Sequence, residues 1–454
     1  MRVPAPDLAR GGMLLLIAIA NTPWYLWGRQ LRPSTIHPPG GSMLDRAVQV
    51  ASIVTVDFRV YPMFAFLFGY GMVQLLTRQE AAGQDRPSVL AQLRRRNAWL
   101  LVFGFLHAAL LWQGDILGAY GLAGLLLARF FLHRADRTLL TWSAIGAALL
   151  TLATLGGIAA ACLAAAAPVR PETVGYLPLG AAPGGQSDPL AAALDRLTFW
   201  PVVTIGQGLL TLALPVAIVL GFWSARRRIL EQPGRHLPLL RHVAIVGVAV
   251  GWLGGLPHAA AVMGWLPVPP ELMFVFEITQ MTTGLPAGLG YAAAFGLLGH
   301  RVSRRRTGAL VTAVTAVGRR SLSAYLAQSF LCAPVLAAWG LGLGAHLHSA
   351  AMAGYAISVW LVTVTGAWLL ERHRLRGPAE IALRRLARRS PDVLVPGPLS
   401  GRGRRNRSFP PPQLPSRGSV RVSPYDATSP AVTPDLVNDK SARRTDNNAA
   451  PGAS

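Results

Sequence analysis

The chain has 454 residues, of which 52% are hydrophobic and 14% charged, and its formal net charge is +23. Arginine supplies this charge, since Lys440 is the only lysine, and no soluble domain rich in basic and aromatic residues accompanies it, which excludes a nucleic-acid-binding protein. The two cysteines, Cys162 and Cys332, lie in apolar stretches without the spacing of a disulfide or a metal site.

Ten long apolar stretches alternate with polar segments along the sequence. About twenty apolar residues cross a bilayer core as a helix, and such uniform runs are unlike the alternating strands of a membrane barrel. The sequence therefore predicts an all-α, polytopic integral membrane bundle of about ten transmembrane helices within residues 1–390. The predicted spans are 12–28, 59–77, 97–113, 116–132, 138–167, 199–223, 243–265, 273–299, 322–344 and 350–370.

Arginine collects in every second gap between these stretches. The N-terminus, the alternate gaps and the segment after the tenth span hold 28 arginines, whereas the opposite loops hold 5. Positive residues stay on the cytoplasmic side of a membrane protein. Both termini are therefore predicted to be cytoplasmic, in a bacterial plasma membrane, with anionic lipid of the cytoplasmic face as a partner.

Three further segments have compositions that predict their state. Residues 43–56 space apolar side chains like a short interfacial helix, and residues 381–389 like a basic amphipathic helix on the inner leaflet. Residues 391–454 are rich in Pro, Ser and Arg with few large apolar side chains, which predicts a disordered cytoplasmic tail.

Polar residues inside the apolar stretches are functional candidates, because an ionisable group is costly in lipid. His107 lies roughly 15 Å deep in the third span, although a histidine hydrogen-bonded for packing alone is an equal alternative. Asp115 follows eight residues later, so both side chains can face one cavity, although a turn aspartate also serves simply as a helix cap. Asp57 and Arg59 stand at the outer end of the second span, where snorkelling or a local pair would also explain them.

The eighth predicted span contains Glu277, the carboxylate for which a purely structural role is hardest to find, with Gln280 one turn deeper. Four residues that favour a broken helix follow: Gly284, Pro286, Gly288 and Gly290. Membrane proteins open their backbone to substrate cavities at such positions. All of these polar residues map to the outer half of the membrane. If they converge, they line a polar cavity in which a histidine beside a carboxylate takes a proton from a hydroxyl.

Five groups of residues occur together with a specific joint spacing. They are Asp7, Arg10 and Gly11 with Asn21; Phe58-Arg59 with Leu67 to Gly71; Arg95-Arg96 with His107, Gly114 to Leu117 and Tyr120; Gly318-Arg319 with Tyr325 and Gln328; and Gly377-Pro378 with Arg384-Arg385. This set resembles the YeiB-like membrane proteins, the domain of unknown function family numbered 418. Ala379 stands where that family has leucine.

That family has no established reaction, but it is distantly similar to transmembrane acyltransferases, which share the opening Asp-x-x-Arg-Gly-like motif. The resemblance implies cytoplasmic acyl-CoA as a co-substrate, no bound cofactor or metal, and a lipid or glycan acceptor in the cell envelope. It also implies three residue roles: His107 as the base, Asp115 or Glu277 as its orienter or acceptor binder, and Arg10, Arg95 and Arg96 as binders of the CoA phosphates. The expected substrate-binding residues are Asp57, Arg59, Gln280, Tyr325 and Gln328.

Two functions from different classes follow from these residues. The first is acyl transfer to an envelope acceptor, with His107 removing the hydroxyl proton. The second is transport or export of a small or lipid-like solute, with Glu277 and His107 as proton-coupling groups. No internal repeat supports transport, and no nucleophile or metal motif supports catalysis. A structural or signalling membrane protein is a third alternative.

Overall fold

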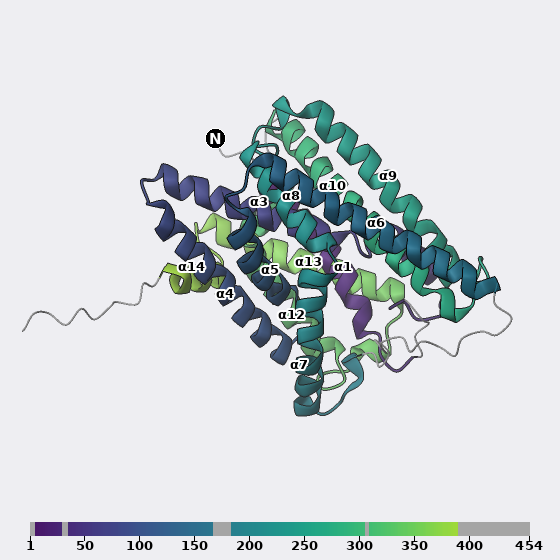
Figure 1. Ribbon diagram of the computed structural model, residues 1–454. Helices are drawn as coiled ribbons and strands as arrows, with labels where there is room; N and C mark the ends of the chain where they lie inside the picture. Colours follow the sequence, from purple (N-terminus) through teal and green to yellow (C-terminus); the bar gives the residue numbers. More distant parts are fainter. Residues whose placement is uncertain (1–4, 30–34, 167–182, 305–307, 389–454) are drawn as a thin grey trace, which may run out of the picture. The chain divides into compact units, whose positions relative to one another are not determined.

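The computed structural model describes residues 5–29, 35–166, 183–304 and 308–388, and every regular element within these ranges is a helix (Figure 1). The chain up to Pro391 forms one compact unit. The predicted tail at 391–454 lies outside the described residues.

Fourteen α-helices are defined in the described part of the chain, and each of the ten predicted spans coincides with one or two of them. The first seven are α1 (Ala5–Asn21), α2 (Met43–Thr55), α3 (Val60–Ala81), α4 (Arg86–Leu110), α5 (Ile116–Phe131), α6 (Asp136–Ala166) and α7 (Pro189–Ile205). The others are α8 (Ala213–Arg226), α9 (Leu237–Val262), α10 (Phe274–Ser303), α11 (Ala309–Arg319), α12 (Ser321–Leu336), α13 (Ser349–Arg372) and α14 (Pro378–Arg388).

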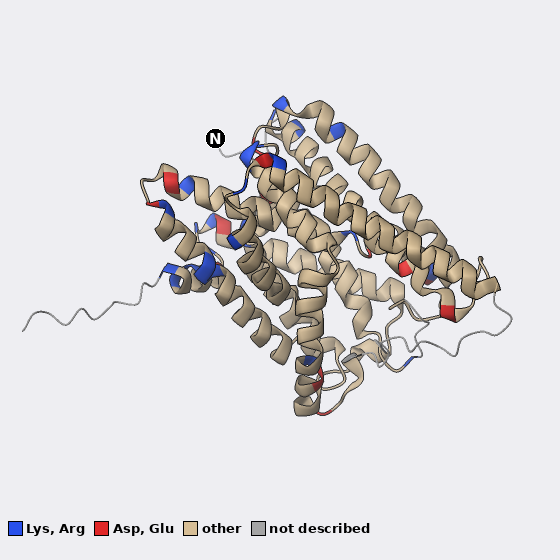
Figure 2. Cartoon of the chain, in the orientation of Figure 1, with Lys and Arg blue, Asp and Glu red and all other residues tan. Residues whose placement is uncertain are grey.

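Among the helices of the described residues, four are long and apolar enough to cross a membrane: α3, α6, α9 and α13. A fifth candidate is the pair formed by residues 189–210 and α8, if this bent pair is one span. In α3, α6, α9 and α13 the arginines and acidic residues lie near the helix ends (Figure 2). The described part of the chain is therefore all-helical and contains membrane-type helices.

Helix α3 lies at the centre of the main core, where it packs against α8 and α10. Its Met63, Leu67 and Met72 are almost completely buried. Helix α6 is the opposite case, since only 6% of its most apolar 18-residue stretch is buried within the protein. Exposed leucines along α6, such as Leu152 and Leu155, would destabilise a protein in water but suit contact with lipid.

The expected break in the eighth span is wrong, because α10 runs without interruption and includes Pro286. Its small residues instead allow close approach of neighbouring chain segments. A Cβ added at Gly247 of α9 would lie 2.3 Å from the Pro286 carbonyl oxygen. One added at Gly284 would lie 2.2 Å from the Phe58 carbonyl oxygen. These residues are therefore required for helix packing and do not unwind the backbone.

The break occurs in the sixth predicted span. Residues 189–210 end in the π-helical segment η3 (Gly206–Leu210), and α8 then leaves at a bend of 53°. Leu212 adopts a positive φ of 56° at the bend, which is an uncommon backbone conformation for a non-glycine residue.

Helix boundaries differ from the predicted ones in several further places; α1, for example, ends at Asn21 and not at residue 28, and α4 begins at Arg86 and not at residue 97. The helix in the sixth span begins ten residues early, at Pro189, because Asp188 caps it and Pro189 suits a first helical position. Helix α12 ends at Leu336, two residues after Pro334, and not at residue 344. Helix α11 lies in a segment that hydropathy assigns to a loop. The short helices expected near residues 43–56 and 381–389 are present as α2 and α14.

Candidate functional site

The structure brings His107 and Asp115 into direct contact. The imidazole Nδ1 lies 2.8 Å from the Asp115 Oδ1, and the two side chains are 1% and 0% exposed. Asp115 also accepts hydrogen bonds from the backbone N–H of Leu117, at 3.2 Å, and of Gly118, at 2.7 Å. One carboxylate therefore caps α5 and orients the histidine at the same time.

Gly104, one turn before His107 on α4, makes this contact possible. A Cβ added there would lie 2.3 Å from both the Asp115 Oδ2 and the Gly118 backbone nitrogen. Gly121 on α5 continues the close contact, since its added Cβ would lie 2.8 Å from the Asn97 carbonyl oxygen. A seam of glycines thus presses the two helices together and positions the Asp115 carboxylate beside the imidazole.

The other side of the imidazole has unused hydrogen-bonding capacity. Within the described residues, the buried His107 Nε2 has no hydrogen-bond partner. The buried hydroxyl of Tyr325 on α12 interacts with the Ile116 backbone. The His107 and Tyr325 ring centroids are 5.1 Å apart. Trp200 of α7 donates to the Asp115 Oδ2 at 3.4 Å. Four helices, α4, α5, α7 and α12, thus meet around one His–Asp pair with an unused imidazole nitrogen.

Arg196 of α7 holds the end of α4 next to this pair. Its guanidinium donates to the carbonyl oxygens of Ala108 at 3.0 Å and Ala109 at 2.8 Å, which lack helical partners at the C-terminus of α4. The same guanidinium lies 5.8 Å from the ring centroid of Trp339. In the sequence, Arg196 is one of the five arginines assigned to the opposite loops, and nothing in its spacing indicates this capping role.

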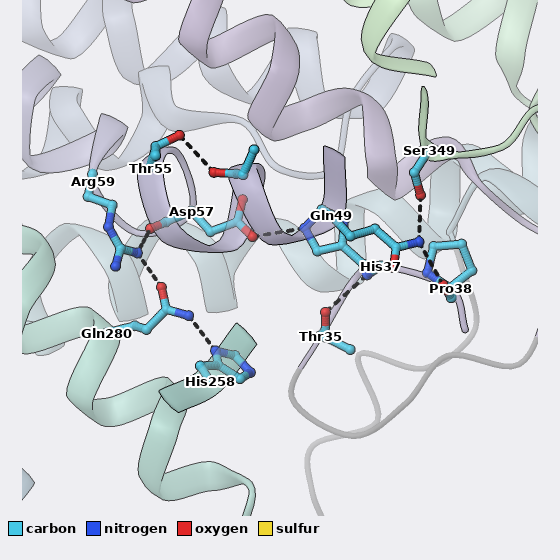
Figure 3. Close-up of polar contacts among 11 residues, drawn as sticks. Thr35, His37, Pro38, Gln49, Thr55, Asp57, Arg59, His258, Gln280 and Ser349 are labelled. Atoms are coloured by element: carbon cyan, nitrogen blue, oxygen red, sulfur yellow. Dashed lines mark hydrogen bonds and ion pairs between the residues drawn. The ribbon is translucent and has the colours of Figure 1, made fainter. Parts of the chain in front are cut away.

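A second group of buried polar side chains lies around the start of α3 (Figure 3). Arg59 is 0% exposed and donates to the backbone carbonyls of Asp57 and Gly251 and to the side-chain oxygen of Gln280. The Gln280 amide in turn contacts the Nδ1 of His258 on α9.

Asp57 belongs to this group through its backbone, while its side chain points elsewhere. Its carboxylate lies 2.9 Å from the His37 Nε2 (Figure 3). The local Asp57–Arg59 pair expected as an alternative is therefore a contact with the backbone carbonyl and not with the carboxylate. Snorkelling is also wrong for Arg59, since its guanidinium is enclosed by protein.

The predicted polar residues therefore form two groups and not one cavity. Glu277 is half-buried on α10, one turn before Gln280, where α10 packs against α6 and α9. His107 lies on α4, which packs mainly against α5, α7 and α14. Among the hydrogen bonds and ion pairs described for the chain, none joins His107 or Asp115 to Arg59 or Gln280.

Two histidines of the second group were missed from the sequence. His258 is buried within the seventh predicted span, so the cost of a polar group in lipid, already applied to His107, would have identified it. His37 is buried as well, but it lies in an outer loop rich in Pro and Gly, where a histidine has no such signal.

Two of the three arginines expected to bind CoA lie against one segment of α3. Arg10 donates to the Leu67 carbonyl at 3.3 Å, and a Cβ added at Gly71 would lie 2.8 Å from its guanidinium. The Arg96 guanidinium lies 5.6 Å from the ring centroid of Phe68. Its charge interacts unfavourably with that of Arg10. Arg10 and Arg96 thus approach the same segment of α3, residues 67–71.

The remaining predicted residues are distributed as follows. Arg95 is half-buried on α4 next to Arg96. Gln328 of α12 is buried and donates to the Leu14 carbonyl of α1 at 3.1 Å, so it links two helices. Arg10 also pairs with Asp7 at 3.4 Å, which joins the first motif of the chain into one local unit.

Comparison with known proteins identifies relatives of this chain. The family model described as "Protein of unknown function (DUF418)" matches residues 224–390, from the end of α8 through α14. The uncharacterized protein YxaH of Bacillus subtilis (strain 168) is 28% identical over 334 residues, which cover 70% of this chain and 76% of that protein. The uncharacterized protein YeiB of Escherichia coli (strain K12) is 28% identical over 361 residues, which cover 72% and 81%. The chain is therefore similar to the YeiB-like proteins, and its residues 224–390 match the DUF418 family.

Within the matched region of this chain, the last two motifs contact each other. Glu380 of α14 accepts from the backbone N–H of Leu322 at 2.8 Å and of Ser323 at 3.1 Å, so it caps the start of α12. Arg319 and Arg320, just before α12, bond to Glu371 at 2.6 and 2.8 Å. These contacts fix the start of α12, one turn before Tyr325. They give a structural reason why the residues of these two motifs occur together.

Proposed function

We propose that this chain is a plasma-membrane protein that transfers an acyl group from cytoplasmic acyl-CoA to a hydroxyl of an envelope lipid or glycan. The proposal includes about ten crossings with both termini in the cytoplasm, supported by the match between helices and predicted spans and by the arginine distribution. The observation that supports the chemistry is the buried His107–Asp115 pair with an unused Nε2.

In this reaction the Asp115 carboxylate accepts the Nδ1–H of His107 and leaves Nε2 as the base. Nε2 takes the proton of the acceptor hydroxyl while its oxygen attacks the thioester carbonyl. The tetrahedral intermediate then collapses, the C–S bond breaks, and the imidazolium returns its proton to the departing sulfur. The products are the acyl ester and CoA with a free thiol. The Tyr325 hydroxyl, beside the imidazole, is the proposed donor to the developing oxyanion.

The donor side of the proposal rests on the arginines of α1 and α4. Arg10 and Arg96 converge on α3, and Arg95 follows on the same turn of α4; guanidinium groups suit phosphate binding. Eleven residues separate Arg96 from His107 on α4, a rise of roughly 16 Å. The pantetheine arm of the donor would have to follow α4 over this distance to bring the thioester to His107.

The test is the release of CoA thiol from acyl-CoA by membranes that contain the full chain and an envelope lipid and glycan extract. His107→Gln should reduce the rate by about 10²- to 10⁴-fold, the usual contribution of a general base. Asp115→Asn should also slow it, because asparagine preserves the helix cap but does not stabilise the imidazolium. Arg10→Gln should raise the KM for acyl-CoA with a smaller effect on kcat.

His133→Gln is the matched control, since His133 lies exposed in the loop after α5 and far from the pair. It should keep the parent rate. Thermal unfolding of each variant separates loss of chemistry from loss of fold. A His107→Gln variant that is folded and releases thiol at the parent rate would contradict the enzyme proposal.

Transport of a small solute is the second candidate function. It is favoured by the hydrogen-bonded series of side chains formed by Arg59, Gln280 and His258. These side chains link α3, α10 and α9 inside the bundle, where polar groups of transporters bind substrates and protons. Asp57 and Glu277 extend the polar region at its outer end. In proteoliposomes, solute or proton flux that is lost in Gln280→Leu but retained in His107→Gln would favour transport over acyl transfer.

A further inference from the structure

A basic pocket lies between the start of α9 and the end of α10, away from both polar groups described above. Its volume is about 230 Å³. The lining residues are Leu237, Arg241, Leu297, His300, Arg301 and Arg304. Three arginines, one histidine and two leucines thus line the space, and most of the surface that they expose to it is apolar.

The positive charge of this pocket is uncompensated within the described part of the chain. None of its three arginines forms an ion pair with a carboxylate there. The nearest segment, η4 (Pro233–Arg235), adds another arginine and packs against α10, with Gly234 beside the His300 ring. Glu231, just before it, is directed elsewhere and bonds to Arg78 and Gln74. The pocket is therefore suited to an anion.

An apolar strip continues from the pocket along the exposed side of α9. Ile245 and Leu253 are 70% and 65% exposed, and Val246, Val250 and Leu256 lie on the same side. Leu298 of α10, next to the pocket residue Leu297, is 45% exposed. The pocket and the strip together form a charged end followed by a long apolar surface, which is the shape of a lipid and not of a free ion.

We propose that this pocket binds the headgroup phosphate of an anionic phospholipid, with its acyl chains along the exposed side of α9. Guanidinium groups bind phosphate with paired, charge-assisted hydrogen bonds. Basic pockets between membrane helices on the cytoplasmic side are suited to acidic headgroups. Inorganic phosphate shares the headgroup chemistry but makes no contact with the strip. The site is independent of the proposed acyl transfer.

Native mass spectrometry of the delipidated full chain in detergent tests this proposal. The parent chain should bind phosphatidylglycerol more tightly than phosphatidylcholine at equal lipid concentration. The pocket variant R241Q/R301Q/R304Q should weaken binding of phosphatidylglycerol by about tenfold or more, given about tenfold for each 1.4 kcal/mol. Binding of phosphatidylcholine should change little.

The matched control is R94Q/R129Q/R137Q, which removes the same charge from exposed arginines outside the pocket. It should keep the parent affinity. Equal losses of phosphatidylglycerol affinity in the two triple variants would mean that the lipid is attracted to positive charge in general, and this would overturn the proposal. Displacement of phosphatidylglycerol by excess inorganic phosphate as effectively as by more lipid would also overturn it, since the acyl chains would then add nothing. If the pocket variant unfolds, R301Q alone, at an exposed position, should still weaken binding measurably.

Discussion

At the scale of single residues, Arg59 shows how a charged side chain is accommodated inside the bundle. Its guanidinium donates to oxygens from three segments: Asp57 before α3, Gly251 on α9 and Gln280 on α10. Such an arginine stabilises the fold because buried carbonyl oxygens need donors. It also ties α3 to the α9–α10 pair.

Arg59→Met should therefore destabilise the protein strongly. The substitution keeps an apolar side chain of similar length but leaves buried acceptors without donors, at about 1–3 kcal/mol each. Thermal and denaturant unfolding in detergent would measure the loss. Arg46→Met, at an exposed arginine of α2, is the control and should change stability little. A parent-like unfolding free energy for Arg59→Met would show that these contacts do not stabilise the fold.

The carboxylate of Asp45, at the junction of α2 and α13, should make the stability of the protein depend on pH. The Ala350 N–H, and then the Ser42 hydroxyl and N–H, hold the pKa of the Asp45 carboxyl below its usual 3.8, although burial opposes this. A lowered folded-state pKa stabilises the protein above pH 3.8, and this contribution is lost as the pH falls through the lower value.

Asp45→Asn should lose this pH-dependent part of the stability. The difference in unfolding temperature between the parent chain and Asp45→Asn should be constant above about pH 5 and shrink below about pH 4. Asp195→Asn, at an exposed aspartate of α7, is the control. A difference that does not change over this range would mean that the Asp45 charge is not responsible.

At the scale of helices, glycine positions decide which helices approach each other closely. A Cβ added at Gly318 of α11 would lie 1.8 Å from the Asp7 carbonyl oxygen of α1. One added at Gly11 would lie 2.0 Å from the Val314 carbonyl oxygen. The backbones of α1 and α11 are therefore in contact at both glycines, which is typical of small residues between membrane helices.

Gly318→Ala should destabilise the protein by about 1–3 kcal/mol or more, because the methyl group must displace backbone. Gly354→Ala on α13 is the matched control, since an added Cβ there meets no atom within 4 Å. Alanine is the better helix former, so this variant should be neutral or more stable by up to about 1 kcal/mol. Unfolding free energies in mixed detergent measure both. Equal effects would contradict the close α1–α11 packing.

The broken helix shows why hydropathy misplaces such features. Gly284, Pro286, Gly288 and Gly290 predict a broken α10, yet these residues pack against other segments and the helix continues. The segment that does break, η3 with Leu212, contains no proline, and its Gly206 and Gly208 stand in the apolar stretch without the Gly-Pro pattern of α10. Whether glycine weakens a helix or allows close packing depends on its neighbours in space, which local sequence does not contain.

At the scale of the whole molecule, the arginine distribution predicts the side of each loop, and cysteine labelling tests it. In a C162S/C332S background, Ser187→Cys before α7 should react with a membrane-impermeant maleimide in intact cells. Gln84→Cys, between α3 and α4, should react only after permeabilisation. Both positions are exposed in the structure. Labelling of both cysteines from one side would contradict the proposed topology.

Hydropathy alone predicts the helical class and a helix near each apolar stretch, and the short motifs carry the family resemblance. Hydrocarbon selects its side chains one segment at a time, so this information lies in short stretches of sequence. The proximity of His107 and Asp115 could also be predicted from their eight-residue spacing, because only the end of one helix and one turn separate them. The tertiary structure decided the rest. It separated Glu277 from His107, joined Arg59 to Gln280 and His258, and assembled the basic pocket of α9 and α10. Each of these depends on which helices pack together, and that is set by contacts between residues far apart in the chain.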